Sequence, residues 1–129
     1  MDRLFLDANV LFSASYRADA GLYRLWKLKN VILCSSRYAL EEARTNLAGE
    51  DQRARLANLS EVVRLFEAGD APLPRGVSLP EKDVPILLAA IVAQATHLLT
   101  GDIRHFGPYF GRRIGGIAIA LPADYLTGR

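Results

Sequence analysis

Four acidic side chains stand where they could carry out metal-dependent chemistry on phosphate groups. Asp7 directly follows the apolar run 4–6, and Asp102 follows a second apolar run. Asp83 begins the apolar stretch that leads into that second run, and Glu42 lies between these segments. Carboxylates gathered at one place repel one another unless a cation neutralises them. We therefore expect a divalent cation at the place where these acids meet.

The available ligand types narrow the choice of this ion. The chain has one cysteine, Cys34, and two histidines, which excludes a zinc site built from thiolates. Ligand sets made only of oxygen suit Mg²⁺ or Mn²⁺. These ions activate a water molecule and stabilise the leaving oxygen in an in-line displacement at phosphorus. The acids therefore indicate phosphoryl chemistry.

Each acid also has an ordinary structural role that must be weighed. A carboxylate next to a buried apolar run is costly without a partner, which favours a functional role for Asp7. Asp83 precedes Val84-Pro85 and is equally well placed to cap a helix. Asp102 follows Gly101, which is also ordinary turn chemistry. The signal is the shared location of the acids and not any one of them.

Helical geometry separates two adjacent glutamates in the predicted helix 37–48. At about 100° per residue, the alanines and leucines of this segment define its buried face. Glu41 lies nearly opposite that face and four residues after Arg37, where a solvated salt bridge is the ordinary role. Glu42 flanks the buried face, from which a side chain can reach a cleft. We choose Glu42, with Glu41 as the alternative.

Weaker candidates surround the acids. Asn9, two residues after Asp7, could orient a water or a carboxylate, although Asn is common in turns. Thr100 and Ser35 end predicted strands and could bind a metal-bound water, with helix capping as an equal alternative. His105 could touch a phosphate, but we expect it to face solvent.

Basic residues near the acids could line a path for phosphates. Arg104 and Arg44 are the candidates for substrate contacts, although a solvated surface is the ordinary place for each. Sixteen Lys and Arg against fourteen Asp and Glu give a net charge of +2. The chain is therefore no polybasic binder, and its overall charge says little about its partners.

The elements that must position these residues are short apolar runs alternating with helical stretches. The predicted strands are 4–6, 31–34, 97–100 and 117–121, with a further short strand near Val77, and the predicted helices are 18–29, 37–48, 51–68 and 83–95. Continuous apolar strands alternating with helices indicate a parallel sheet covered on both faces. Right-handed crossovers make this a three-layer α/β domain. Sites in such sheets form beyond the carboxyl ends of the strands.

Size and composition limit the class of protein. The 129 residues predict one domain, residues 1–129, without an internal boundary. Half of the residues are apolar, which supports a buried core and excludes disorder. The longest apolar stretch, 84–93, is shorter than the roughly 20 residues of a membrane span. The N-terminus does not resemble a signal peptide, and one cysteine fits a reducing compartment, so we expect a cytoplasmic protein with no membrane contact.

Four segments in this order resemble the PIN domain family. They are LFLDANVL (4–11), LEEAR (40–44), DVPILLAA (83–90) and LLTGDIRHF (98–106), and together they span nearly the whole chain. The resemblance implies a three-layer α-β-α sandwich with a five-stranded parallel sheet in the order 3-2-1-4-5. It also implies a Mg²⁺- or Mn²⁺-dependent ribonuclease.

The resemblance further implies roles for individual residues. The family's acidic quartet matches Asp7, Glu42, Asp83 and Asp102, of which the three aspartates are the expected metal ligands. Asn9 matches a frequent neighbour of the first Asp, and Thr100 matches the small hydroxyl residue before the last. Many members have a further acid shortly after the last Asp, where this chain has Arg104 and His105.

Small free-standing PIN domains are similar to the VapC-like toxin halves of bacterial toxin–antitoxin pairs. This similarity implies an RNA substrate, a homodimer, and an antitoxin protein whose tail enters the acidic cleft. The predicted helical pair 37–68 is the expected surface for that partner.

Two other functions compete with a ribonuclease. A non-catalytic RNA- or protein-binding module could keep the fold, and its binding would not depend on a metal. A phosphatase of the haloacid dehalogenase kind also has an Asp after its first strand. That chemistry needs a second Asp two residues later, where this chain has Asn9.

Overall fold

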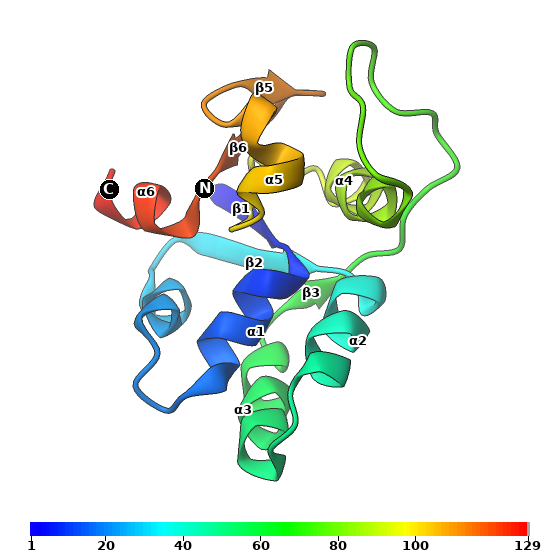
Figure 1. The fold of residues 1–129 in the computed structure, drawn as a ribbon. Coiled ribbons are helices and arrows are strands. Elements are labelled where there is room, and N and C mark those ends of the chain that lie inside the picture. The colour runs from blue at the N-terminus through cyan, green and yellow to red at the C-terminus, as the bar shows by residue number, and fades with distance from the viewer. Residues whose placement is uncertain (129) are drawn as a thin grey trace.

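The computed structural model describes residues 1–128, so Arg129 of the predicted domain lies outside the described residues. A six-stranded sheet forms the middle layer (Figure 1). Its strands are β1 (Asp2–Leu6), β2 (Val31–Ser35), β3 (Arg64–Leu65), β4 (His97–Leu99), β5 (Arg113–Ile114) and β6 (Ile117–Ala120), in the spatial order β3-β2-β1-β4-β6-β5. Neighbouring strands are parallel except for the antiparallel pair β5–β6.

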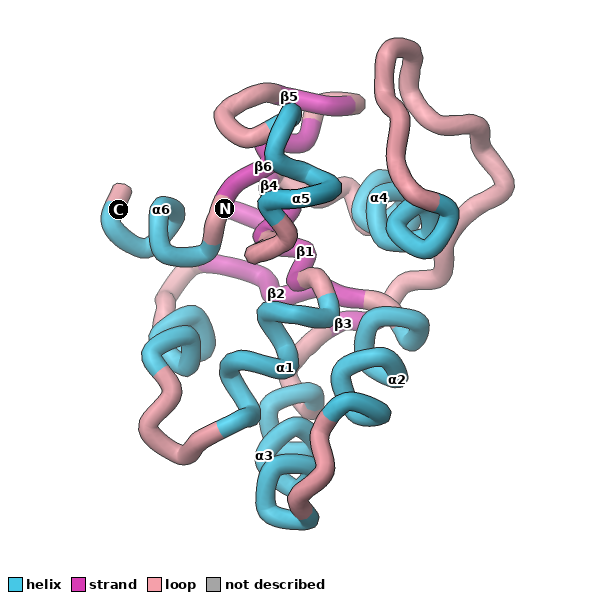
Figure 2. Tube along the Cα trace, viewed as in Figure 1, coloured by secondary structure: helices cyan, strands magenta, loops and turns pink. Residues whose placement is uncertain are grey.

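Helices cover both faces of this sheet. The α-helices are α1 (Ala8–Tyr16), α2 (Arg37–Asn46), α3 (Glu50–Ser60), α4 (Val84–Val92), α5 (Ile103–Phe106) and α6 (Pro122–Thr127). Three short 3₁₀ helices are η1 (Gly21–Lys27), η2 (Glu81–Asp83) and η3 (Gly107–Tyr109). Helices α1, α2 and α3 pack together on one side of the sheet, and α4 lies on the other (Figures 1 and 2). The predicted three-layer α/β class is therefore confirmed.

The core is built around the central strand β1. Leu4, Phe5 and Leu6 have no exposed surface, because β1 is flanked by β2 and β4 and covered on both faces. Strands that are buried on both faces have continuous apolar sequences instead of alternating apolar and polar residues. Helix α4 is apolar throughout and buries four of its residues, Ile86, Leu87, Ala89 and Ala90. The sequence-based expectation of a mostly buried helix here is confirmed.

The strand order changes direction between β1 and β4. From β1 the chain goes outward to β2 and β3, and it then crosses to β4 and β6 on the other side. Ligands bind at such a switch point, outside the carboxyl ends of the strands. Leu6 lies opposite Leu99 in the register, and the amide of Asp7 donates to the Leu99 carbonyl at 3.1 Å. Asp7 and Thr100 are thereby brought side by side.

The predicted helix 18–29 corresponds to the shorter 3₁₀ helix η1, and the helix before it was not predicted. The structure has helix α1 directly after β1, followed by η1, where we expected one helix over 18–29. Asp7 caps α1 by accepting from the amide of Ala8 at 2.7 Å. Val10 and Leu11 are buried. Extended backbone at Arg17 ends the helix.

The predicted helix 51–68 is too long, and the strand predicted near Val77 is absent from the described residues. Helix α3 ends at Ser60, and β3 follows at Arg64–Leu65 to pair with β2. Val62 and Val63 lie between them, and β-branched residues are poor helix formers. The chain after Ser60 therefore leaves the helix and pairs with β2, although its apolar residues continue the helical spacing. Val77 lies in a turn, where its amide donates to the Pro74 carbonyl at 3.2 Å.

Two differences concern the last third of the chain. Helix α4 ends at Val92 instead of residue 95, and Gln94 has a left-handed backbone with φ of 54°. The sheet has a sixth, antiparallel strand where five parallel strands were expected. A turn at Gly115-Gly116 connects β5 to β6, and both glycines have positive φ. The remaining strands follow the expected order 3-2-1-4-5, with β6 in the fifth place.

The two ends of the described chain lie near each other (Figure 1). The hydroxyl of Tyr125 in α6 donates to Asp2 Oδ2 of β1 at 2.6 Å. Within residues 1–128, none of the helices has the length and apolar character needed to span a lipid bilayer.

Candidate functional site

Asp7 is the buried centre of the site. It is 4% exposed, and both of its carboxylate oxygens accept hydrogen bonds. Oδ1 accepts from the Ala8 amide at 2.7 Å. Oδ2 accepts from the hydroxyl of Thr100 at 2.8 Å and from Asn9 Nδ2 at 3.1 Å. These contacts hold the carboxylate in one orientation at the carboxyl end of β1.

Asn9 and Thr100 connect Asp7 to the loop after β4. Thr100 is fully buried, and its hydroxyl oxygen accepts from the Asp102 amide at 3.0 Å. Asn9 Oδ1 accepts from the Gly101 amide at 2.7 Å. A Cβ at Gly101 would lie 3.3 Å from that oxygen, so a glycine allows this close approach. The expected contact between Asn9 and the Asp7 carboxylate is present.

Asp83 joins Asp7 from the opposite layer. It lies at the end of η2, directly before α4, and is 6% exposed. Its side chain makes no capping hydrogen bond to α4, so helix capping does not explain why an acid is buried here. The Tyr38 hydroxyl of α2 donates to the Lys82 carbonyl at 2.7 Å. This bond ties the segment that carries Asp83 to the helix that carries Glu42.

Asp102 and His105 complete the acidic centre from helix α5. Asp102 caps α5, because its Oδ1 accepts from the His105 amide at 3.1 Å. His105 Nδ1 lies 2.8 Å from Oδ2 of both Asp83 and Asp102. The expectation that His105 faces solvent is wrong, since its side chain is only 21% exposed. The first turn of α5 directs the imidazole back toward the acids.

One hollow of about 610 Å³ brings together acids from four separate segments. Its polar lining comes from Asp7, Asn9, Ser13, Glu42, Lys82, Asp83 and Asp102. Glu42 is exposed and reaches the hollow from α2. Glu41 does not line it; this residue lies 3.8 Å from Arg44 in an exposed ion pair. The pairing with Arg37 is absent, because Arg37 lies 3.5 Å from Glu67.

Several sequence candidates lie outside this hollow. Arg44 and Arg104 are exposed and are not among its lining residues. Ser35 is fully buried, and its hydroxyl donates to the Leu6 carbonyl at 2.7 Å. It therefore ties β2 to β1 and does not face the site. Ser36 caps α2 by accepting from the Ala39 amide at 3.1 Å.

In the absence of a cation, burial and the charges of neighbouring acids disfavour the charged forms of Asp7 and Asp83. Burial raises the pKa of Asp7 to about 6, and the nearby charges of Asp83 and Glu42 act in the same direction. Burial also raises the pKa of Asp83, an effect that His105 and Lys82 partly offset. A divalent cation would reverse this penalty, because it favours the charged carboxylates. The donor set of carboxylate oxygens therefore fits Mg²⁺ or Mn²⁺.

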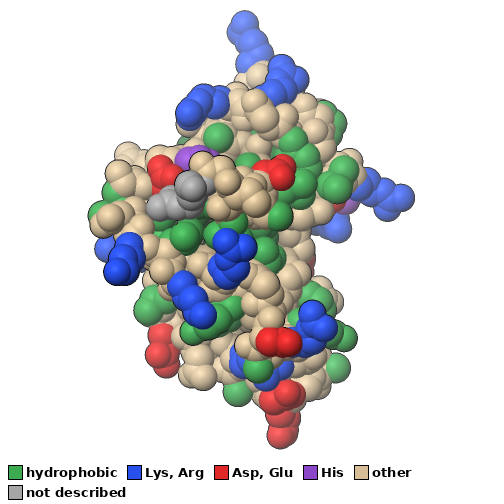
Figure 3. Space-filling view, turned by 90° about the vertical axis from the view of Figure 1, so that its left-hand side faces the viewer, with side chains coloured by type: hydrophobic (Ala, Val, Ile, Leu, Met, Phe, Trp, Pro, Cys, Tyr) green, Lys and Arg blue, Asp and Glu red, His purple; other side chains and the backbone are tan. Residues whose placement is uncertain are grey.

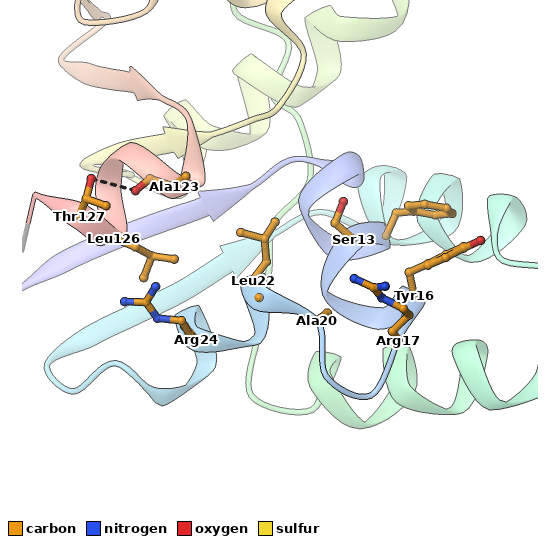
Figure 4. Close-up of a pocket in the computed structure, with 11 residues that line it drawn as sticks. Ser13, Tyr16, Arg17, Ala20, Leu22, Arg24, Ala123, Leu126 and Thr127 are labelled. Atoms are coloured by element: carbon orange, nitrogen blue, oxygen red, sulfur yellow. Dashed lines mark hydrogen bonds between the residues drawn. The ribbon is translucent and has the colours of Figure 1, made fainter.

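A second hollow of about 550 Å³ continues from the first one. Both are lined by Ser13, Leu22 and Ala123, so they adjoin. Figure 4 shows the second hollow between α1, η1 and α6, with Arg17 and Arg24 at its edge. Figure 3 shows the face that carries α6, where Lys and Arg side chains lie among hydrophobic side chains, other surface and several Asp and Glu side chains. A basic and partly apolar groove thus adjoins the acidic hollow.

Comparisons with known proteins agree with the fold. The chain is similar to a chain in the crystal structure of VapBC2 from Rickettsia felis bound to a DNA fragment from their promoter, with a TM-score of 0.66. The match covers 92% of this chain and 98% of that chain at 16% sequence identity. It shows a shared three-layer α/β fold. Neither a protein-family model nor a curated protein matches the chain.

The sequence indicated His105 only as a possible phosphate contact that faces solvent, and its contact with the acids and the basic edge of the second hollow were not predicted. The sequence signal for His105 was its position three residues after Asp102, which places both on one face of a helical turn. Arg17 and Arg24 gave no such signal, because α6 from the other end of the chain completes their hollow.

Proposed function

We propose that this chain is a Mg²⁺- or Mn²⁺-dependent endoribonuclease of the PIN kind. The observation that carries the proposal is the convergence of Asp7, Glu42, Asp83 and Asp102 on one hollow at the switch point of the sheet. Two of these acids, Asp7 and Asp83, are buried almost completely. Buried acids in such proximity are costly for a fold unless they bind a cation.

The residues of the site divide into ligands, positioning residues and a base. Asp7, Asp83 and Asp102 would hold the ion, while Asn9 and Thr100 fix the orientation of Asp7 through their hydrogen bonds. When bound, the ion supplies charge stabilisation at the phosphate and an acidified water. Glu42 is more exposed than the aspartates. It can therefore take a proton from the attacking water at the rim of the hollow.

The surroundings of the site support a nucleic-acid strand as the substrate. Lys82 lines the acidic hollow, and Arg17 and Arg24 line the groove that continues from it. Cations along a groove bind successive phosphates of a strand. The two aromatic side chains in the second hollow, Phe12 and Tyr16, offer surfaces on which bases stack. We propose RNA as this strand.

A protein partner is part of the same proposal. The similar chain belongs to VapBC2, which was crystallised with DNA from its promoter. By analogy, we propose that this chain is the toxin component of a type II toxin–antitoxin pair and that it acts in the cytoplasm as a homodimer. The antitoxin would contact α2 and α3 and place a tail in the acidic hollow. Binding of a purified antitoxin would then inhibit cleavage.

A cleavage assay tests the nuclease. Structured and single-stranded RNAs are incubated with the wild type, Asp7→Asn or Asp70→Asn, each in Mn²⁺, Mg²⁺ or EDTA. Asp70 is exposed in a loop outside the hollow, so Asp70→Asn controls for the loss of one charge. We expect metal-dependent cutting by the wild type and Asp70→Asn but not by Asp7→Asn. RNA binding without cutting, unchanged by EDTA and Asp7→Asn, would instead establish a binding module.

Thermal unfolding measures ion binding independently of the substrate. An ion at one hundred times its dissociation constant stabilises the folded state by about 2.7 kcal/mol. We expect Mg²⁺ or Mn²⁺ to raise the melting temperature of the wild type by several degrees, and EDTA to reverse the shift. Asp7→Asn should show a smaller shift. Equal melting with and without millimolar ion would contradict a metal site.

A further inference from the structure

His105 contacts two of the acids through a single nitrogen. Nδ1 lies 2.8 Å from Asp83 Oδ2 and 2.8 Å from Asp102 Oδ2. The backbone of His105 is fixed by the bond from its amide to Asp102 Oδ1. This bond occupies one oxygen of Asp102 and leaves Oδ2 on the side of the imidazole ring. The position of Nδ1 is thus set by the first turn of α5.

These contacts are not a normal hydrogen-bonded pair. Asp83 Oδ2 and His105 Nδ1 are buried, and neither atom has a hydrogen bond of acceptable geometry among residues 1–128. A single Nδ1–H can be shared between two acceptors at 2.8 Å only through two bent and weakened hydrogen bonds. Buried polar atoms without partners are costly, so each one needs an explanation. A cation bound between the three atoms would provide one, since all three carry lone pairs.

The spacing of the three atoms fits the first coordination sphere of an ion. Adjacent ligand atoms around an octahedral ion with bonds of about 2.1 Å lie about 3.0 Å apart. The two distances from Nδ1 are 2.8 Å, and the ligand atoms of Asp83, Asp102 and His105 all lie within 4.8 Å of one another. The side chain of Asp83 is only 9% exposed, so few water molecules can compete for its carboxylate.

We propose that His105 is a metal ligand that binds beside Asp83 and Asp102 and adds one nitrogen to the carboxylate oxygens of the proposed site, which therefore prefers Mn²⁺ to Mg²⁺. The inference rests on the proposed function, because the bound ion is taken to be the one that serves RNA cleavage. Imidazole binds transition metal ions, whereas Mg²⁺ prefers carboxylates, carbonyls and water. One nitrogen ligand therefore shifts the choice of ion toward Mn²⁺ without excluding Mg²⁺.

Pulsed electron paramagnetic resonance of bound Mn²⁺ tests the proposal without any substrate. The chain has two histidines, and His97 lies in β4 with its Nδ1 2.8 Å from Thr96 Oγ1. We expect nitrogen coupling to Mn²⁺ in the wild type and in His97→Gln, and its loss in His105→Ala. Nitrogen coupling absent from the wild type, or kept in His105→Ala, would overturn the proposal. Failure of the wild type to bind Mn²⁺ would overturn it as well.

Calorimetric titration with each ion gives a second readout. We expect His105→Ala to lower Mn²⁺ affinity by about ten-fold and Mg²⁺ affinity by less than about three-fold. His105→Asp should restore tight binding but with a weaker preference for Mn²⁺. Circular dichroism confirms that each variant is folded. Equal losses for the two ions would show that His105 acts only as an ion-pair partner of the acids.

The outcomes separate this inference from the nuclease proposal. RNA cleavage without nitrogen coupling would leave the nuclease in place and remove His105 from the ion. Nitrogen coupling without cleavage of any RNA would confirm the ligand and contradict the nuclease.

Discussion

Asp7 is held in surroundings that disfavour its own charge. Its burial raises the pKa to about 6, well above the usual range of an aspartic acid. A carboxyl group with a higher pKa in the folded state binds a proton more tightly there than in the unfolded chain. Its contribution to stability is therefore fully present below pH 4. It is lost as the pH rises through about 6.

This shift predicts a pH-dependent stability that Asp7→Asn removes. In EDTA, the wild type should lose stability between pH 4 and pH 7 relative to Asp7→Asn, by about 3 kcal/mol for a shift of this size. Denaturant unfolding at several pH values measures the difference. Asp83, whose pKa is also raised, is present in both proteins, so it enters this difference only through its repulsion of Asp7. A constant difference between the two proteins from pH 4 to pH 7 would contradict the prediction.

Glu42 and Glu41 provide a matched pair on one helix. Glu42 lines the acidic hollow, while Glu41 pairs with Arg44 outside it. If Glu42 is the base, Glu42→Gln should lower the cleavage rate by about a hundred-fold or more. Glu41→Gln should leave the rate within about two-fold of the wild type. Equal effects of the two substitutions would rule out a specific role for Glu42.

At the scale of single residues, the sequence predicted the positions of the acids better than the contacts of the residues around them. Asp7 and Asp102 could be placed because each follows an apolar run whose end defines an edge of the sheet. Asn9 and Thr100 follow from the same strand ends. The contact of His105 with Asp83 depends on how α5 packs against the end of η2. A helix of four residues, Ile103–Phe106, has no periodicity from which that packing could be predicted.

At the scale of the elements, helix α1 and strand β3 were missed for different physical reasons. Helix α1 buries Val10, Leu11 and Ala14 but also has other apolar residues, so its pattern shows no clear polar face. Strand β3 has two exposed residues and forms only because β2 offers a free edge to pair with. Long buried strands could be predicted from local pattern. Short elements that depend on tertiary pairing could not.

The glycine pair between β5 and β6 allows a test of strand β5, which was not predicted from the sequence. Gly-Gly between apolar runs is a turn signal, because such turns need positive φ at both positions. Gly116 has φ of +84° with open space around its Cβ position, so only backbone strain opposes a side chain there. We expect Gly116→Ala to lower the free energy of unfolding by about 1–2 kcal/mol.

The control for this substitution is Gly21→Ala at the start of η1. Gly21 also has open space around its Cβ position, and its φ is not in the left-handed region. We expect no loss of stability there, or a small gain, because alanine restricts the unfolded chain. Urea unfolding of both variants measures the comparison. Equal stability of Gly116→Ala and the wild type would contradict the hairpin.

At the scale of the whole molecule, charge distribution carries information that the net charge hides. The net charge is only +2, yet the acids converge on one hollow while Arg17 and Arg24 line the adjoining one. Attraction of a polyanion to the second hollow would bring its strand past the proposed metal site. This separation of charge arises from the fold, because α6 from the end of the chain packs beside η1 near its beginning.

The groove predicts that substrate binding and catalysis respond to different residues. Arg17→Ser with Arg24→Ser should raise KM for a long RNA by about ten-fold and leave kcat nearly unchanged, since in the proposed path the arginines would contact phosphates away from the reacting bond. The slope of log affinity against log salt should become shallower by about 1.4, because each single-strand phosphate contact contributes about 0.7.

The control removes the same charge elsewhere. Arg64 and Arg75 are exposed and line neither hollow, so Arg64→Ser with Arg75→Ser should preserve both KM and the salt slope. Steady-state cleavage at several salt concentrations provides both quantities. A short RNA that spans only the acidic hollow should be cut equally well by all three proteins. If the two double variants weaken binding of the long RNA equally, the groove is not the path of the strand, and non-specific attraction explains the binding.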